Sequence, residues 1–429
     1  MEALSMKIII HITNFGKIEK ADIELGKFIV FVGENNSGKT YLMQLIYGFI
    51  QKVLNQTDLL LKYEFSNADL SSNKIKIDSN RIYDMQERLN EELKQELDDI
   101  ILSIFKTSIP IEKCQLEFVL EENDAFLFCL LKESNKSNFR YMLDVSDDQH
   151  DHKEYYHTYT GESSYKVLFN LLLNAAGFDL YTTFFPAART GLQLLYKEYF
   201  LNVTTDKFKG NLMSKGTSLT TPLYDYLNYL QGYYYREDIA EINKKLIIFL
   251  QEHLLDGKLN IGIDVTYTPV ENENIEIPLY VASSMISELL PFYYLLTRVE
   301  NYTTLIVDEI ESSLHPHKQF EMVRMLNRLC NQGKRIIIST HSDNITNKIN
   351  NLFMLSKRYQ EENICDILKQ CHLEQEDLLI DSEVLVYNFE KHNGKSIVEQ
   401  AEYNERFGYS FTEFEDAVSN LIEEAKAIF

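Results

Sequence analysis

A short apolar run, followed by a glycine-flanked loop and a helical pattern, constrains this chain more than any other stretch. Residues 27–32 read KFIVFV, which predicts a buried strand. Residues 33–40 read GENNSGKT, which is the full spacing G-x-x-x-x-G-K-[ST], and a helix is predicted over 40–53. A strand, such a loop and a helix in this order are typical of proteins that bind the phosphates of nucleoside triphosphates.

The residue types of this loop each have a chemical role. Gly33 and Gly38 allow the backbone to turn so that successive N–H groups point at phosphate oxygens. The helix that follows adds the positive end of its dipole. Lys39 is placed to reach the outer phosphates, and the Thr40 hydroxyl to bind Mg²⁺. The predicted triphosphate site is formed by Gly33, Glu34, Asn35, Asn36, Ser37, Gly38, Lys39 and Thr40.

Two later strands carry polar residues at their carboxyl ends. Residues 303–307 (TTLIV) lead into Asp308 and Glu309, and residues 334–339 (KRIIIS) lead into a segment with His341. Asp308 would hold Mg²⁺ through water, and Glu309 would polarise the attacking water. His341 could bond the γ-phosphate or that water, whereas a single histidine after a strand is usually structural. The order of the three motifs favours the functional interpretation.

The composition limits the class of protein. A chain of 429 residues, 45% of them hydrophobic, can form two or three domains with a large core. It has neither a run of eighteen uncharged apolar residues nor a signal-peptide layout, so no membrane span is expected. Five scattered cysteines without a C-x-x-C pair fit a reduced cytoplasmic protein with buried thiols. The formal charge of −23 counts against nonspecific coating of nucleic acid, although a local basic groove is not excluded.

Hydrophobic periodicity predicts the remaining elements. Strands are expected over 7–13 and 20–25, and one amphipathic helix over 82–105. Three runs separated by polar turns predict an antiparallel meander over 114–120, 125–131 and 139–145. Helices are further predicted over 163–202 with an interruption at 184–191, over 222–235, 238–254, 285–298 and 413–428. Strand pairs are predicted over 259–267 and 275–281, and strands over 383–389 and 395–401.

Two stretches have competing interpretations. Residues 147–152 (DDQHDH) are of metal-ligating types, but no element orients them, so a solvated acidic loop is favoured. The tyrosines within 224–235 could stack on nucleic-acid bases. Packing in and on a helix is favoured for them, because basic residues are not interleaved with them.

Taken in order, several segments resemble ABC-type ATPases of the SMC/RecF kind, and within these the OLD-like group of AAA-annotated ATPases. The likeness spans most of residues 6–355. It is carried by ITNFGKIEKADIEL (12–25), GENNSGKT (33–40), FFPAARTGL (184–192), LIVDEIESSLHP (305–316) and THSDNI (340–345).

The resemblance implies an α/β fold: an ABC-type P-loop ATPase head with a mixed sheet core and an antiparallel β subdomain, joined to a helical lobe and an α+β insertion. The expected domains are the first part of the head over 1–53, the insertion over 54–180, the helical lobe over 181–256, the second part of the head over 257–356 and a small α+β extension over 357–429.

The resemblance also implies a homodimer, or a higher homo-oligomer, with ATP and Mg²⁺ held between heads. Ser283 and Ser284 would then present hydroxyls and N–H groups to a γ-phosphate of the opposite subunit; a plain helix N-cap is the alternative. This segment lacks the family's usual glycines. Arg189 is a candidate for sensing the γ-phosphate or relaying its state, with an ordinary surface ion pair as the alternative.

By resemblance, the chain is expected to hydrolyse ATP and to control a separate effector, a nuclease or a toxin, in anti-phage defence. No intrinsic nuclease is expected, because the residues after 355 show no Glu followed by a D-x-D strand end. One alternative is a RecF/SMC-like DNA-repair clamp gated by ATP, hinted at by Lys207, Lys209 and Lys215. The other is the ATP-binding subunit of a membrane transporter, which the missing signature glycines disfavour.

Overall fold

The structure is a computed structural model of the chain. It describes residues 6–54, 58–60, 62–63, 74–120, 126–132, 139–145, 153–159, 164–178, 181–187, 189–195, 219–231, 236–262, 264–297, 302–361, 363–379, 383–411, 422–426 and 428. Contacts divide the chain into two units, each built from three separate segments. The first comprises residues 1–26, 44–182 and 391–398, and the second comprises residues 27–43, 183–390 and 399–429.

In the first unit, four strands of one sheet follow the order β5-β1-β2-β16. The strands β1 (Met6–Phe15) and β2 (Ile18–Glu24) are antiparallel, β5 (Lys113–Leu120) is antiparallel to β1, and β16 (Lys395–Gln400) is parallel to β2. Side chains of β1 alternate in burial, as expected for strands with one face on a core.

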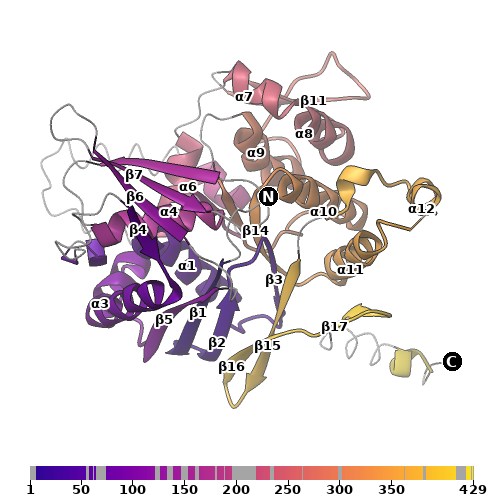
Figure 1. The fold of residues 1–429 in the computed structure, drawn as a ribbon. Helices are drawn as coiled ribbons and strands as arrows, with labels where there is room; N and C mark the ends of the chain where they lie inside the picture. Colours follow the sequence, from indigo (N-terminus) through magenta and orange to yellow (C-terminus); the bar gives the residue numbers. More distant parts are fainter. Residues whose placement is uncertain are drawn as a thin grey trace, which may run out of the picture. The chain divides into compact units, whose positions relative to one another are not determined.

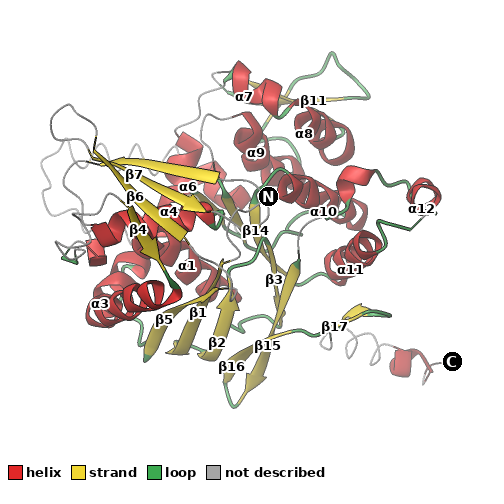
Figure 2. Cartoon of the chain, in the orientation of Figure 1, coloured by secondary structure: helices red, strands yellow, loops and turns green. Residues whose placement is uncertain are grey.

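The helix α3 (Ser79–Phe105) packs beside β5 in the same unit (Figures 1 and 2). Its N-cap is Asp78, whose side chain accepts a hydrogen bond from the Arg81 N–H at 3.0 Å. Asn90 donates to the Leu116 carbonyl at 2.8 Å, which joins the helix to β5. The apolar residues that recur at helical spacing along the predicted helix are all buried: Met85, Leu89, Leu93, Leu97, Ile100 and Ile104.

A separate antiparallel sheet has the order β4-β6-β7-β8. The predicted meander over 114–120, 125–131 and 139–145 is therefore wrong in its first strand, because β5 pairs with β1 over eight residue pairs. Alternation of apolar residues determines which face of a strand is buried, but it does not determine which strand it pairs with. The strands of this sheet are β4 (Lys74–Ile77), β6 (Phe126–Lys132), β7 (Phe139–Val145) and β8 (Lys153–Tyr159).

The second unit is built on five strands in the order β15-β3-β14-β13-β9. β3 runs parallel to both β14 and β15, and β13 runs parallel to β14. Every residue of β3, β13 and β14 is buried, which explains their continuous apolar runs. The five strands are β3 (Phe28–Gly33), β9 (Thr182–Phe185), β13 (Thr304–Val307), β14 (Arg335–Thr340) and β15 (Val384–His392).

Helices make up most of the rest of this unit. They are α1 (Lys39–Phe49), which continues into the first unit, α6 (Thr221–Gln231), α7 (Glu237–Ile242), α8 (Lys244–Phe249), α9 (Ser284–Thr297), α10 (Pro316–Asn331), α11 (Asp343–Lys357) and α12 (Ile364–Gln370). The first unit contains α4 (Ser164–Ala175). These elements confirm the predicted α/β class with a mixed sheet.

Several predicted boundaries are wrong. The run 163–202 contains the strand β9 as well as helices, and a short helix covers 189–195. The strand pair predicted over 259–267 corresponds to β10 (Gly257–Ile261) and β11 (Val265–Pro269), whereas the stretch 275–281 contains the single short strand β12 (Ile277–Pro278). Most of the helix predicted over 413–428 lies outside the described residues. The predicted domain boundaries stay predictions.

Two expectations from composition concern membranes and thiols. None of the helices among the described residues combines the length and hydrophobicity needed to cross a bilayer. Cys114 and Cys330 are buried, and burial raises the pKa of the Cys114 thiol to about 12. Cys365 and Cys371 are exposed, so the expectation of buried thiols is wrong for these two.

Candidate functional site: the phosphate loop and the acidic strand end

The loop between β3 and α1 adopts backbone conformations that favour glycine. Gly33 and Gly38 have φ values of 152° and 104°, and Asn36 has a φ of 64°. A Cβ on Gly33 would lie 2.8 Å from the Cβ of Phe389 on β15, so a side chain there would clash. Glu34, Asn35 and Asn36 are exposed. The turn therefore requires the two glycines that the motif specifies.

Lys39 lies inside the curve of this loop. Its Nζ donates to the carbonyl oxygens of Gly33 and Glu34 at 2.6 and 2.8 Å, and to the Ser37 hydroxyl at 3.3 Å. Lys39 and Ser37 are both buried, although a lysine is rarely buried without a partner. A positive charge is thus held where the loop N–H groups and the start of α1 favour an anion.

Three segments far apart in the sequence meet around Asp308, at the end of β13. The Thr40 hydroxyl donates to Asp308 Oδ2 at 2.8 Å, and the Ser339 hydroxyl donates to Asp308 Oδ1 at 2.5 Å. Asp308 is 1% exposed. Because β3, β13 and β14 are parallel, their carboxyl ends meet at one edge of the sheet and bring these groups together.

A hydroxyl and a carboxylate are the hard oxygen ligands that Mg²⁺ prefers. Within the described ranges, no group of three or more His, Cys, Asp or Glu side chains could hold a metal ion. A cation bound at Thr40 and Asp308 would therefore need additional oxygens, which phosphate and water supply in nucleotide sites.

Glu309 follows Asp308 in a left-handed conformation, with a φ of 47°. Such a conformation costs a residue with a side chain about 1–3 kcal/mol and is often found at functional sites. Its N–H donates to the Ser339 hydroxyl at 2.8 Å. Burial raises the pKa of Glu309, and the nearby carboxylates of Asp308 and Glu311 raise it further. A half-buried carboxylate with a raised pKa is suited to accept a proton.

His341 lies beside the same cluster. Burial lowers the pKa of His341 and the positive charge of Lys39 lowers it further, while Asp308 and a backbone hydrogen bond with Gly33 oppose that shift. The lowered pKa favours the neutral form of the imidazole near pH 7. Its main-chain N–H donates to Glu311 Oε1 at 2.5 Å, and the Thr340 hydroxyl donates to Glu311 Oε2 at 2.8 Å.

Sequence reasoning did not single out Glu311 and Ser339. Glu311 holds the chain that carries His341, and Ser339 joins the carboxylate of Asp308 to the N–H of Glu309. The signals were a third acid in the run Asp-Glu-Ile-Glu and a serine at the end of an apolar strand.

Arg189 is almost fully buried, so it does not form the ordinary surface ion pair that was one of its two interpretations. Its Nε donates to Glu288 Oε2 on α9 at 2.5 Å. Its other nitrogens donate to the carbonyl oxygens of Pro186, Asp308 and Glu309 at 3.0, 2.8 and 3.1 Å. Arg189 thus binds the main chain of the acidic strand end to α9, and Glu288 is a further partner that sequence reasoning missed.

Ser283 and Ser284 are exposed at the start of α9. The Ser283 carbonyl accepts a hydrogen bond from the Ile286 N–H at 3.0 Å. Glu288 lies one turn further along the same helix, so Arg189 connects this helix to the acidic strand end. Action on an opposite subunit stays a prediction.

Some of the remaining candidate residues lie outside the part of the chain that the structure describes, and others lie within it. Residues 147–152, the lysines Lys207, Lys209 and Lys215 and the tyrosines of 232–235 lie outside the described residues. Tyr226 and Tyr229 are buried, with ring centroids 6.4 Å apart, and burial raises the pKa of Tyr226 strongly. These two tyrosines form part of the core, as the packing interpretation expected.

Comparison with known proteins identifies one family and several similar folds. A family model described as an AAA ATPase domain matches residues 6–174 and 201–346. The SMC head domain from Thermotoga maritima is 12% identical, with 92% of this chain and 99% of that chain covered and a TM-score of 0.37.

Two further structures are similar. An Smc head bound to the C-winged helix domain of ScpA is 11% identical, with coverage of 93% and 98% and a TM-score of 0.40. An Smc head with an extended coiled coil, bound to the C-terminal domain of ScpA from Pyrococcus furiosus, is 11% identical, with coverage of 98% and 100% and a TM-score of 0.37. No curated protein matches the chain.

Proposed function

The chain belongs to the AAA ATPase domain family, and we propose that it binds ATP with Mg²⁺ at residues 33–40 and hydrolyses it through Glu309. One observation carries this proposal: the Thr40 hydroxyl, which follows Lys39 in the phosphate loop, donates to Asp308 of a distant segment at 2.8 Å, and Glu309 and His341 lie beside this pair.

Each residue has a defined part in the proposed reaction. Lys39 and the loop N–H groups bind the outer phosphates, and Thr40 and Asp308 hold Mg²⁺. Glu309 accepts a proton from the attacking water, which its raised pKa favours. The neutral imidazole of His341 bonds the γ-phosphate or that water. Bound Mg²⁺ supplies neutralisation of phosphate charge.

We further propose that two copies assemble around ATP, with Ser283 and Ser284 of one copy facing the nucleotide of the other. Arg189 supports this, because it connects the acidic strand end to the helix that begins at Ser284. By resemblance to OLD-like ATPases, the assembly is a cytoplasmic regulator of a separate nuclease or toxin in anti-phage defence. The nucleotide state would select between assembled and released forms.

The test is a Glu309→Gln variant compared with wild type and with Lys39→Ala. Glu309→Gln should bind ATP and slow its hydrolysis by on the order of 100-fold or more, since it removes the proton acceptor. It should also accumulate as a dimer or larger assembly with ATP, measured by light scattering. Lys39→Ala should neither bind ATP nor assemble.

A bulky Ser284→Tyr change in the Glu309→Gln background locates the assembly surface. We expect ATP binding without assembly. Full hydrolysis by Glu309→Gln would remove Glu309 from its role, and assembly of the Ser284→Tyr variant would place the contact elsewhere. Strong stimulation of the ATPase by duplex DNA would instead indicate a DNA clamp.

A further inference from the structure

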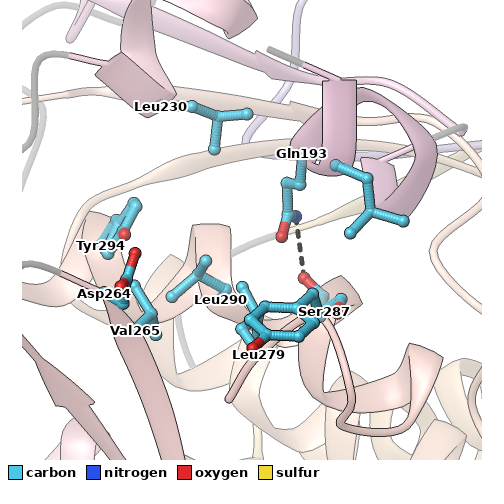
Figure 3. A pocket seen from close by; sticks show the side chains of 10 residues that line it. Gln193, Leu230, Asp264, Val265, Leu279, Ser287, Leu290 and Tyr294 are labelled. Carbon is cyan, nitrogen blue, oxygen red and sulfur yellow. Dashed lines mark hydrogen bonds between the residues drawn. The ribbon is translucent and has the colours of Figure 1, made fainter. Parts of the chain in front are cut away.

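The second unit contains a cavity of about 180 Å³ apart from the phosphate loop (Figure 3). It lies between the helix 189–195, α6, α9 and the strand β11. Much of its wall is apolar, and the aliphatic side chains that line it are Leu194, Leu230, Val265, Leu279 and Leu290.

The amide of Gln193 provides an acceptor on this wall. Gln193 is 7% exposed, and its Nε2 donates to the Ser287 carbonyl at 2.8 Å and to the Tyr226 hydroxyl at 3.2 Å. Since a carbonyl can only accept, the amide nitrogen must face Ser287 and the oxygen must face away. In Figure 3 the amide reaches from its helix toward the cavity.

The Oε1 atom of Gln193 is buried and has no hydrogen-bond partner among the residues that the structure describes. A buried acceptor left unsatisfied costs about 1–3 kcal/mol. The cavity that Gln193 lines is larger than the 150 Å³ that holds benzene in an engineered apolar site. A ligand with an apolar body and one hydrogen-bond donor would fill the cavity and also satisfy the Gln193 acceptor.

We propose that this cavity binds a planar aromatic ring of about indole size with a single N–H or O–H donor, directed at Gln193 Oε1. At the rim, Leu194 and Tyr280 are 53% and 74% exposed, so apolar surface continues outward from the cavity. The ring can therefore arrive as a free small molecule or as the side chain of a tryptophan on another protein.

The cavity shares its walls with the Arg189 connection. The helix 189–195 carries both Arg189 and Gln193, and α9 carries both Glu288 and Leu290. A ring held between these two helices stabilises the arrangement in which Arg189 binds the carbonyls of Asp308 and Glu309. Occupancy therefore changes the rate of ATP hydrolysis, and this part rests on the proposed function.

Binding can be measured directly, because the chain contains no tryptophan. Indole is titrated with the full chain and its own fluorescence is recorded. We expect saturable binding with a blue shift, and about fivefold to tenfold weaker binding of 1-methylindole, which lacks the donor and leaves the Gln193 acceptor unsatisfied. Equal binding of the two compounds, or no saturable binding of indole, would overturn the proposal.

Two variants distinguish the pocket from unspecific binding. Gln193→Leu should remove the preference for indole over 1-methylindole even if overall affinity changes, and Leu279→Phe should fill the cavity and weaken both ligands. If Gln193→Leu still prefers indole over 1-methylindole, Gln193 Oε1 is not the acceptor of the ligand's hydrogen bond. A peptide with one tryptophan competes if the source is a side chain, and fails to compete if the source is a free ligand.

The regulatory part has a separate readout. Indole should change the wild-type ATPase rate at least about twofold, and Lys39→Ala should bind indole normally without hydrolysing ATP. Indole binding with an unchanged ATPase rate would overturn the regulatory part alone. If the wild-type protein binds indole but does not hydrolyse ATP, the proposed function is contradicted and the ligand site is retained.

Discussion

Glu309 and His341 have pKa values that move in opposite directions, and burial is the first cause of both shifts. Burial disfavours the charged form of either group. The carboxyl therefore protonates at a higher pH than an ordinary glutamate, and the imidazole protonates at a lower pH than an ordinary histidine. Both groups are in the form that the proposed hydrolysis requires, carboxylate and neutral imidazole, only on the alkaline side of these values.

We expect the ATPase rate to fall as the pH falls through the raised pKa of Glu309, above the ordinary value of about 4.3. The measurement is kcat against pH for wild type and for His341→Gln, whose side chain does not titrate. The acidic decline should persist at the same pH in His341→Gln, at a lower maximal rate. If the acidic decline of kcat disappears in His341→Gln, the titrating group is His341 and not Glu309.

Residue identity and spacing alone identified Lys39, Thr40, Asp308, Glu309 and His341 as members of one cluster, and the structure brings them together. Each of these side chains belongs to a local motif at the end of a strand, so its position follows from short-range pattern. Glu311 and Ser339 could not be assigned a role from the sequence, because each acts by holding neighbours that follow another strand.

At the scale of elements, Arg189 joins three segments that are distant in sequence. One planar guanidinium binds Glu288 on α9, the Pro186 carbonyl after β9, and the two carbonyls after β13. The guanidinium carries several N–H donors in fixed directions and can bond these acceptors at once, whereas the lysine ammonium is a compact point charge. The orientation of the turn that carries Glu309 therefore depends on arginine at this position.

Arg189→Lys should lower kcat by on the order of 10–100-fold with little change in ATP binding, because a small displacement of a catalytic group is costly. Initial rates and a nucleotide-binding titration measure the two effects. The matched control is Arg358→Lys, since Arg358 pairs with Glu361 on the surface. An equal loss of ATP binding in Arg189→Lys would point to a general structural role.

Strand pairing at this scale was only partly predictable. The strands β5 and β6 both carry clear patterns, yet β5 joins β1 and β6 joins β4 and β7. The side-chain period of two determines which face is buried, and it is the same for any partner. Partner choice depends on long-range packing, including the side chain of Asn90 on α3, which bonds the main chain of β5.

At the scale of the whole molecule, a buried charge network joins distant parts of the second unit. Asp377 is 0% exposed and accepts hydrogen bonds from Arg324 and Arg328 of α10 at 2.9 and 2.8 Å, and from the Glu374 N–H at 2.8 Å. Burial by itself would raise the pKa of Asp377, but these hydrogen bonds lower it below its ordinary value.

Asp377→Asn should lower the free energy of unfolding at pH 7 by at most about 3–5 kcal/mol, because it removes the fully buried charged partner of Arg324 and leaves it paired with Glu321 alone. Since the pKa of Asp377 is lowered on folding, its contribution is present above pH about 4 and is lost as the pH falls. Urea unfolding at several pH values measures the difference.

The difference in the free energy of unfolding between wild type and Asp377→Asn should become smaller toward acidic pH. The exposed pair of Arg358 and Glu361 offers a control, and Glu361→Gln should change stability little. A gap of constant size at all pH values would show that the charge of Asp377 is not the source of the effect.

The sequence by itself determined the α/β class, the phosphate loop and the acidic strand end, because these depend on short-range periodicity and on residues within one motif. Only the tertiary structure decided that β15, near the end of the chain, lies beside β3 and that Arg189 is buried against the acidic strand end. It alone also showed the cavity beside Gln193. Such features arise from packing between segments that are distant in the sequence, which local pattern does not encode.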